Sequence, residues 1–324
     1  MTLFDAIRQR VRRRAIKKEI ARIRQITVGE IMTKYVITIK AEEEVIRAAT
    51  KMIAEDISCL VVIKGENTPT GVLSERDFLK KVPLNGAVFN MKVKDIMSPN
   101  LTTVLPTMKI PDAVALMKEK GFRRLVVAEN NVLLGVVTQT DFTKTINKFF
   151  VSYPEMQKLS IGSLMTKQVL SVTPKNNVAQ AKEKMLKIDV GAIIIVDEKN
   201  KNIPLGIFTE YDVVMQFYDQ HGKLQMNNIE KYMRKYVRAM PAQASIFAAN
   251  KLMLEKNMRR ILVVDGEKII GILTQTDICR FIYPALDMIE KIIDEPDIVM
   301  KRFSAMTEIH GEFRGEHLKV YVVG

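Results

Sequence analysis

The sequence predicts an α/β fold built from four βαββα units in two pairs, and two observations lead to this prediction. First, six positions recur four times in one register, as expected of tandem repeats: an opening methionine, an alanine, a second methionine, a glycine, a serine or threonine, and an aspartate. Second, each copy contains one amphipathic stretch followed by two apolar, β-branched runs. The opening methionines are Met32, Met97, Met165 and Met233.

Each element of a unit follows from its local pattern. Residues 42–56 of the first copy have apolar residues at helical spacing, and Ala48 and Met52 lie on one face of the expected helix. We interpret this alanine–methionine pair, which recurs in every copy, as core packing. The run LVVIKG and the segment TGVLS predict a buried hairpin. The motif Ser74-x-x-Asp77 then starts the last helix of the unit.

The repeats divide the chain into four units and two flanks. The units are expected at residues 26–83, 91–150, 159–219 and 227–283. Residues 1–25 predict a basic amphipathic helix, and residues 284–324 predict a short helix followed by a β-hairpin. Because a unit of about 60 residues buries too little surface to be robust alone, we expect the units to pair back to back.

The copies alternate at two places. Units 2 and 4 share the string TQTD and a double arginine, Arg123–Arg124 and Arg259–Arg260. Units 1 and 3 have SERD and TEYD, with Ser58–Cys59 and Gly191–Ala192 where the arginines would be. This alternation indicates a pair that was later duplicated.

The D-I-M opening, the glycine-x-x-[Ser/Thr]-x-x-Asp ending and the spacing between them resemble the cystathionine-β-synthase (CBS) domain family over residues 26–283. The resemblance implies pseudo-symmetric pairs that stack as a flat disc, with clefts that bind AMP, ADP or ATP as regulatory ligands and no required cofactor. It also implies that aspartates hold the ribose while hydroxyls and arginines approach the phosphates. The nucleotide-binding residues expected in this way are Asp141, Thr138, Thr140, Arg123, Arg124, Asp277, Thr274, Thr276, Arg259, Arg260, Asp77, Ser74, Asp212 and Thr209.

These residues also have structural interpretations. A Ser or Thr with an acid three residues later is a capping box, which stabilises a helix by about 1 kcal/mol, and we expect one in all four units. The arginine pairs are equally consistent with solvated side chains at a helix end. The arginines make units 2 and 4 the stronger nucleotide candidates. Unit 4, however, has Ala239 where the other units have a hydroxyl near the expected base, so its recognition of adenine is in question.

The net charge of +13 is concentrated near the N-terminus. Residues 1–26 carry nine Lys and Arg against Asp5 and Glu19, a balance of +7. This density favours an anionic partner, RNA first and a membrane surface second. The alternative is a helix that packs its apolar face (Phe4, Ile7, Val11, Ile16, Ile20 and Ile23) on the disc. The expected RNA-binding residues are Arg8, Arg10, Arg12, Arg13, Arg14, Lys17, Lys18, Arg22 and Arg24.

Other classes of protein are not indicated. The P-loop, dinucleotide-binding, zinc-protease and serine-hydrolase motifs do not occur, so we do not expect an enzyme. His221, His310 and His317 are scattered without cysteine partners and predict no metal site. The two cysteines are far apart, and no run reaches the roughly 18 apolar residues of a membrane span. We therefore expect a cytoplasmic protein.

The combined features predict a non-enzymatic, adenine-nucleotide-responsive regulatory protein that docks on RNA. In domain count, charge and basic extension the chain resembles archaeal CBS proteins that sit on ribosomal subunits, so a ribosome-binding hibernation factor is the most specific form of this hypothesis. The alternatives are a nucleotide-sensing regulatory subunit of a separate enzyme or transporter, and a DNA-binding regulator. Homodimerisation through the CBS pairs is left open.

Overall fold

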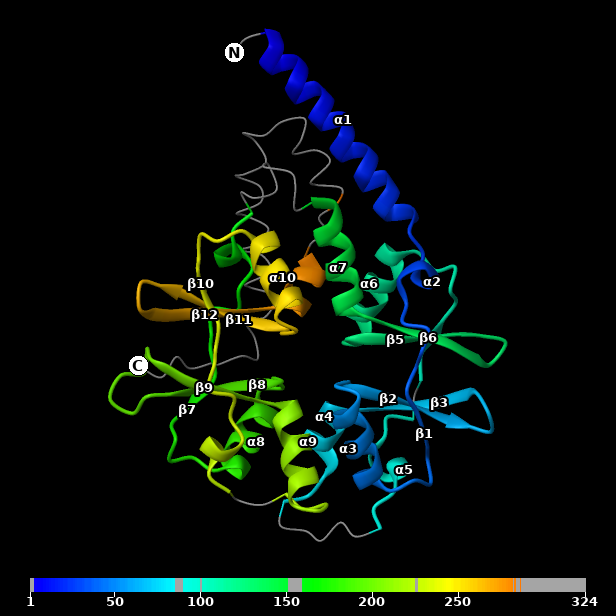
Figure 1. Cartoon of the computed structure of the whole chain (residues 1–324), viewed down its shortest axis with the longest axis vertical. Coiled ribbons are helices and arrows are strands. Elements are labelled where there is room, and N and C mark those ends of the chain that lie inside the picture. Colours follow the sequence, from blue (N-terminus) through cyan, green and yellow to red (C-terminus); the bar gives the residue numbers. More distant parts are fainter. Residues whose placement is uncertain are drawn as a thin grey trace.

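Four small three-stranded sheets with helices on their outer sides form a flat assembly around a common centre, and one long helix extends beyond its edge (Figure 1). The computed structural model describes residues 3–84, 90–99, 101–150, 159–224, 227–281, 283 and 286, with the backbone alone for residues 3–10, 12, 13, 149 and 150. The predicted α/β fold, the four units and the N-terminal helix are confirmed. The predicted helix and hairpin at 284–324 lie, apart from residue 286, outside the described residues.

The first pair of units follows the long N-terminal helix α1 (Leu3–Gln25). Unit 1 consists of α2 (Val28–Ile31), β1 (Thr38–Lys40), α3 (Val45–Ala54), β2 (Cys59–Lys64), β3 (Thr68–Ser74) and α4 (Glu75–Lys81). Unit 2 consists of α5 (Val93–Ile96), β4 (Thr103–Val104), α6 (Ile110–Lys120), β5 (Arg124–Glu129), β6 (Val132–Thr138) and α7 (Gln139–Phe150).

The second pair repeats this order. Unit 3 consists of the 3₁₀ turn η2 (Ile161–Ser163), β7 (Ser171–Val172), α8 (Val178–Lys187), β8 (Ala192–Val196), β9 (Pro204–Thr209) and α9 (Glu210–Asp219). Unit 4 consists of η3 (Ile229–Lys231), β10 (Ala239–Pro241), α10 (Ile246–Glu255), β11 (Arg260–Asp265) and β12 (Lys268–Thr274), and residues 275–281 are helical.

All four sheets have one topology. The first strand runs parallel to the second, and the second forms an antiparallel hairpin with the third. The β-branched runs are apolar on both faces because both faces are covered. In β2, Val62 packs with the helices of units 1 and 3, while Val61 packs with Val126 of the neighbouring sheet.

The units of a pair are interlocked by their opening segments. Thr33 of unit 1 exchanges two backbone hydrogen bonds with Val136 of unit 2, with N···O distances of 2.9 and 3.0 Å, and Ser98 of unit 2 does the same with Val72 of unit 1. Units 3 and 4 repeat both exchanges. The opening methionine beside each exchange lies against the glycine of the partner's hairpin, as Met32 does at Gly135.

Two larger cores join the pairs to each other. The helices of units 1 and 3 share one core, which contains Met52 and Met185, and those of units 2 and 4 share the other. The second methionine of every unit is at most 1% exposed, so the predicted core role of the alanine–methionine pairs is confirmed. Lys182 of unit 3 adds a polar link, since its ammonium group donates to the carbonyl oxygen of Val82 in unit 1.

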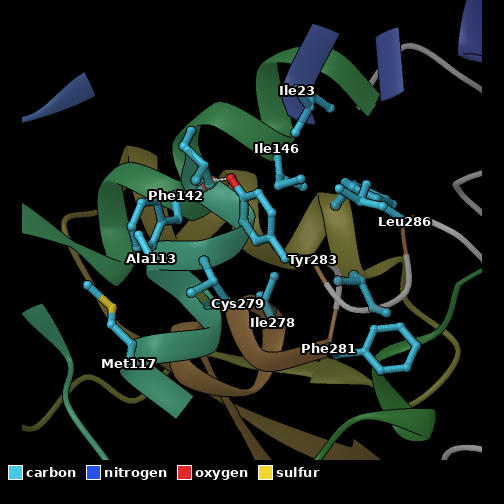
Figure 2. Packing of buried hydrophobic residues seen from close by; sticks show 14 of the residues in the cluster. Ile23, Ala113, Met117, Phe142, Ile146, Ile278, Cys279, Phe281, Tyr283 and Leu286 are labelled. Atoms are coloured by element: carbon cyan, nitrogen blue, oxygen red, sulfur yellow. Dashed lines mark hydrogen bonds between the residues drawn. The ribbon is translucent and has the colours of Figure 1, made fainter. Parts of the chain in front are cut away.

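The second half of α1 packs on the core of units 2 and 4. Ile16, Ile20 and Ile23 are buried there, and Figure 2 shows Ile23 beside Ile146 of α7. Val11, by contrast, is 62% exposed. Among the described side chains the predicted apolar face is therefore buried only toward the end of α1, and the helix projects from the disc before that point (Figure 1).

None of the described helices has both the length and the apolar character that a membrane span requires.

Candidate functional site

The four motif aspartates lie at equivalent helix starts. In unit 2 the backbone N–H and the hydroxyl of Thr138 both donate to Oδ2 of Asp141, over 2.8 and 2.7 Å. The same two bonds join Ser74 to Asp77, Thr209 to Asp212 and Thr274 to Asp277. The capping role predicted for all four units is confirmed, and it occupies only one oxygen of each carboxylate.

The other carboxylate oxygen distinguishes the units. We define an aspartate site as three residues: the capping Ser or Thr, the aspartate, and the residue that follows the opening methionine of the paired unit. In unit 1, Ser98 donates to Oδ1 of Asp77 over 3.0 Å, and Lys81 lies 3.4 Å from the same oxygen. In unit 3, Arg234 Nε lies 3.5 Å from Oδ1 of Asp212.

Asp141 in unit 2 keeps an oxygen for a further donor. Within the described part of the chain no other residue donates a hydrogen bond to Oδ1 of Asp141, and this residue is half-buried. Burial raises the pKa of Asp141, and the two bonds from Thr138, the charge of Lys144 and the backbone N–H of Asp141 itself oppose this effect. A partly desolvated carboxylate with spare acceptor capacity gains from new donors, such as a pair of vicinal hydroxyls.

The predicted arginine pairs join opposite units through carboxylates, and the charges of Arg123, Arg259 and Arg260 act on one another. Figure 1 shows the four units converging on the centre of the disc. Arg123 of unit 2 crosses to Glu210 of unit 3, with a 2.6 Å Nη2–Oε2 distance, and Arg259 of unit 4 crosses to Glu75 of unit 1 at 3.1 Å. Both ion pairs join diagonally opposed units. The alternative of solvated arginines at a helix end is wrong for Arg123 and Arg259, because both side chains are bound to buried carboxylates.

The second arginine of each pair contacts its own partner unit. Arg124 donates to the hydroxyl of Ser58 over 3.1 Å, and Arg260 donates to the carbonyl of Gly191 over 2.9 Å. Burial lowers the pKa of Arg260 to about 10, and the charge of Arg259 acts in the same direction. The centre thus holds more positive than negative charge, which is the condition for binding an anion.

Arg76 of unit 1 adds a further cation to this cluster. Its guanidinium group donates to Oε1 of Glu210 over 3.0 Å and also pairs with Asp189. Glu210 is only 1% exposed and therefore carries two arginine partners in a buried setting. We call the set Glu75, Arg76, Arg123, Arg124, Glu210, Arg259 and Arg260 the central charge cluster.

The threonines between cap and aspartate make hydrogen bonds between units. Thr140 donates to the side-chain oxygen of Gln275 over 2.7 Å, and Thr276 donates to that of Gln139 over 2.7 Å. These reciprocal bonds join units 2 and 4 across their interface. The structure therefore places Thr140 and Thr276, which were expected at the nucleotide, in contacts between units.

The expected RNA-binding residues lie on α1, away from the aspartate sites. Arg14, Lys18 and Arg22 are exposed, while Lys17 and Arg24 are half-buried. The side chains of Arg8, Arg10, Arg12 and Arg13 lie outside the described residues. The described basic side chains thus belong to the part of α1 that packs on the disc.

Sequence reasoning missed the acidic half of the central charge cluster. Glu75 and Glu210 were given no role of their own within the motifs SERD and TEYD, although units 2 and 4 have glutamine at the same position. It also missed Ser98 and Arg234. The alternation of Glu in units 1 and 3 with Arg-Arg in units 2 and 4 was the available signal. In the described ranges no group of three or more His, Cys, Asp or Glu side chains is arranged to hold a metal ion.

The family model of the CBS domain matches residues 28–84, 93–148, 161–219 and 229–284. The chain is 27% identical over 197 residues to the uncharacterized protein MJ1225 of Methanocaldococcus jannaschii, which covers 59% of this chain and 69% of that protein. It is 36% identical over 121 residues to MK0525 of Methanopyrus kandleri, covering 37% and 62% of the two chains.

Two solved structures share the fold over most of the chain. The crystal structure of MJ1225, which has been proposed to be an archaeal homologue of γ-AMPK, matches with a TM-score of 0.69 at 17% identity, over 79% of this chain and 100% of that one. A conserved protein of Pyrococcus horikoshii matches with a TM-score of 0.53 at 18% identity, over 78% and 98%. At these identities the likeness concerns the fold alone.

Proposed function

The chain belongs to the CBS domain family, and on this premise we propose that it is a regulatory protein without catalytic activity that binds an adenine nucleotide in unit 2 and docks on RNA through α1. The most specific form of this proposal is a ribosome-binding hibernation factor. The observation that carries the nucleotide part is Oδ1 of half-buried Asp141, to which no other described residue donates a hydrogen bond.

The surroundings of Asp141 support a ribose and phosphate ligand. A ribose offers two adjacent hydroxyl donors to a carboxylate, and each hydrogen bond to a charged group contributes about 1.5–3 kcal/mol. Arg123 and Arg124 of the same unit belong to the central charge cluster, where cations exceed carboxylates. The proposal that MJ1225 is an archaeal homologue of γ-AMPK agrees with this assignment.

Asp141→Asn is expected to weaken binding of AMP, ADP or ATP by about 10- to 100-fold, because the amide removes the charge while it can still accept the cap bonds. Isothermal titration calorimetry on the full chain measures this. Asp95→Asn is the matched control, since Asp95 makes the equivalent cap bond with the backbone N–H of Lys92 on an exposed helix start. Equal affinity in Asp141→Asn and the native chain would refute the assignment.

The basic residues of α1 support the RNA part of the proposal. Ile16, Ile20 and Ile23 anchor α1, so its arginines and lysines are presented on a fixed element. Deletion of residues 1–26 would uncover this core and confound loss of binding with loss of fold. Charge-removing substitutions at exposed positions give a cleaner test.

Arg14→Gln combined with Lys18→Gln is expected to reduce the slope of log K against log salt for single-stranded RNA by about 1.4, since each lost phosphate contact contributes about 0.7. Fluorescence anisotropy with a labelled oligonucleotide between 50 and 300 mM salt (roughly a twofold span of Debye length) measures it. Lys64→Gln with Lys199→Gln removes the same charge from exposed positions elsewhere. An identical drop in both double variants would indicate nonspecific attraction.

The alternatives predict other outcomes of the same assays. Equal or tighter binding to duplex DNA would favour a DNA-binding regulator. Absence of RNA binding together with a co-purifying enzyme or transporter, retained at high salt, would favour a regulatory subunit. Dimers through the CBS pairs would appear in sedimentation analysis as twice the 36.9 kDa mass of the chain.

A further inference from the structure

The aspartate site of unit 3 is occupied by the guanidinium group of Arg234, which belongs to the paired unit 4. Arg234 of unit 4 donates through Nη2 to the hydroxyl of Thr209 over 2.9 Å, and its Nε lies 3.5 Å from Oδ1 of Asp212. Its guanidinium carbon lies 5.6 Å from the centre of the Tyr211 ring. One side chain therefore engages the hydroxyl, the carboxylate and the aromatic ring of this site.

The backbone places this position identically in every unit. Arg234 exchanges two 2.9 Å backbone hydrogen bonds with Ile207, two residues before the capping threonine of unit 3. In the same place the other units have Thr33, Ser98 and Thr166, all short hydroxyl residues. Only in unit 3 does the paired segment supply a side chain long enough to reach the outer oxygen with a positive charge.

Arg234 neutralises the charge of Asp212, yet its own side chain is accessible from solvent. Asp212 is 5% exposed, whereas the side chain of Arg234 is 54% exposed. A buried carboxylate needs a counter-charge or hydrogen-bond donors, and Arg234 supplies both. The contrast with Asp141, whose second oxygen has no described partner, is a difference between two equivalent positions of one chain.

We propose that Arg234 occupies the unit 3 site in place of a ligand and closes it to nucleotide, so that it determines which units bind. This inference rests on the proposed function, because the excluded ligand is the adenine nucleotide assigned to unit 2. Arg234 competes for the same two groups, the carboxylate and the hydroxyl, that a ribose and its phosphate would use. Its partial exposure permits removal by substitution without opening the core.

The test is Arg234→Thr, which gives unit 3 the residue found at Thr33 and Thr166. We expect calorimetric titration with AMP to show one additional binding site per chain. In the Asp141→Asn background, where unit 2 is weakened, Arg234→Thr is expected to restore AMP binding by at least 10-fold. Lys235→Thr is the matched control, because it removes one charge from the adjacent exposed position and should leave the number of sites unchanged.

Every outcome decides between the two proposals. If the native chain binds AMP and Arg234→Thr binds the same number or fewer, Arg234 is not a barrier and this inference is wrong, while the function stands. If only Arg234→Thr binds, the inference holds and the function proposed for unit 2 is wrong. If neither binds, both are wrong. Arg234→Gln, which keeps the length of the side chain but not its charge, serves as a second variant, and thermal melts establish that each variant is folded.

Discussion

Glu210→Gln is expected to destabilise the protein by about 3–5 kcal/mol, the range for removal of one partner from a buried ion pair. Glu210 is 1% exposed and is the shared counter-ion of Arg123 and Arg76. The amide keeps the size of the side chain but removes the carboxylate partner of Arg123 and leaves Arg76 paired with Asp189 alone. Urea denaturation followed by circular dichroism at pH 7 measures the loss.

Two other glutamates provide a graded control. Glu75 occupies the equivalent position in unit 1, but among the described residues its one ion-pair partner is Arg259, which is 40% exposed, so Glu75→Gln should cost less. Glu198 pairs with Lys175, which is 80% exposed, and Glu198→Gln should change stability by less than about 1 kcal/mol. A Glu210→Gln variant no less stable than Glu198→Gln would show that the central charge cluster does not hold the units together.

The pH dependence of stability should differ between Glu210→Gln and the native chain. Burial opposes its ionisation, but the charges of Arg123 and Arg76 hold the pKa of Glu210 below its ordinary value of 4.5. A depressed pKa means that the unfolded chain binds the proton first as pH falls. The contribution of this carboxylate is therefore present above pH 4.5 and is lost as pH falls through the folded-state pKa. That portion of the acid transition should be absent from Glu210→Gln.

An added anion should partly rescue the same variant. If the uncompensated arginines are the cause of instability, then inorganic phosphate can take the place of the lost carboxylate. We expect phosphate to raise the melting temperature of Glu210→Gln by more than that of the native chain. This comparison also measures how readily the centre of the disc accepts an anion.

The fold was predictable because its signals are local and repeated. The alanine and methionine on each of α3, α6, α8 and α10 are four residues apart, so their common burial follows from helical geometry. The hairpin and the capping box are likewise set by neighbouring residues. Fourfold repetition in one register made each weak signal strong, and the structure confirms the resulting architecture.

The central charge cluster could not be placed because its contacts join residues that are far apart in the chain. Arg123 and Glu210 are 87 positions apart, and Arg259 and Glu75 are 184 apart. A single unit shows an unexplained glutamate or an unexplained pair of arginines, and only the diagonal arrangement of units brings them together. For α1, helical spacing identified the apolar face, but the point at which the disc ends depends on packing and is marked by exposed Val11.

The close contact between the opening segment of one unit and the hairpin of its paired unit leads to the second large predicted effect on stability. A Cβ atom at Gly135 would lie 2.6 Å from Sδ of Met32 and 2.9 Å from the carbonyl oxygen of Thr33. The methionine can move, but the Thr33 carbonyl is fixed by its 3.0 Å bond from the backbone N–H of Val136. Gly135→Ala is therefore expected to destabilise the protein by about 1–3 kcal/mol, the range for overpacking, measured by urea denaturation. At an unstrained site the same substitution would be stabilising by about 0.4–1 kcal/mol.

A double-mutant cycle with Met32→Ala separates the two clashing atoms. Removal of the methionine side chain makes room for the new methyl group, so the double variant should be more stable than the sum of the single effects by at least about 1 kcal/mol. The same cycle at Gly71 and Met97 should show weaker coupling, because there the sulfur is 3.2 Å from the added atom while the Ser98 carbonyl is at 2.9 Å. Equal coupling at both sites, or none at Gly135, would mean that the methionines do not hold the paired units in register.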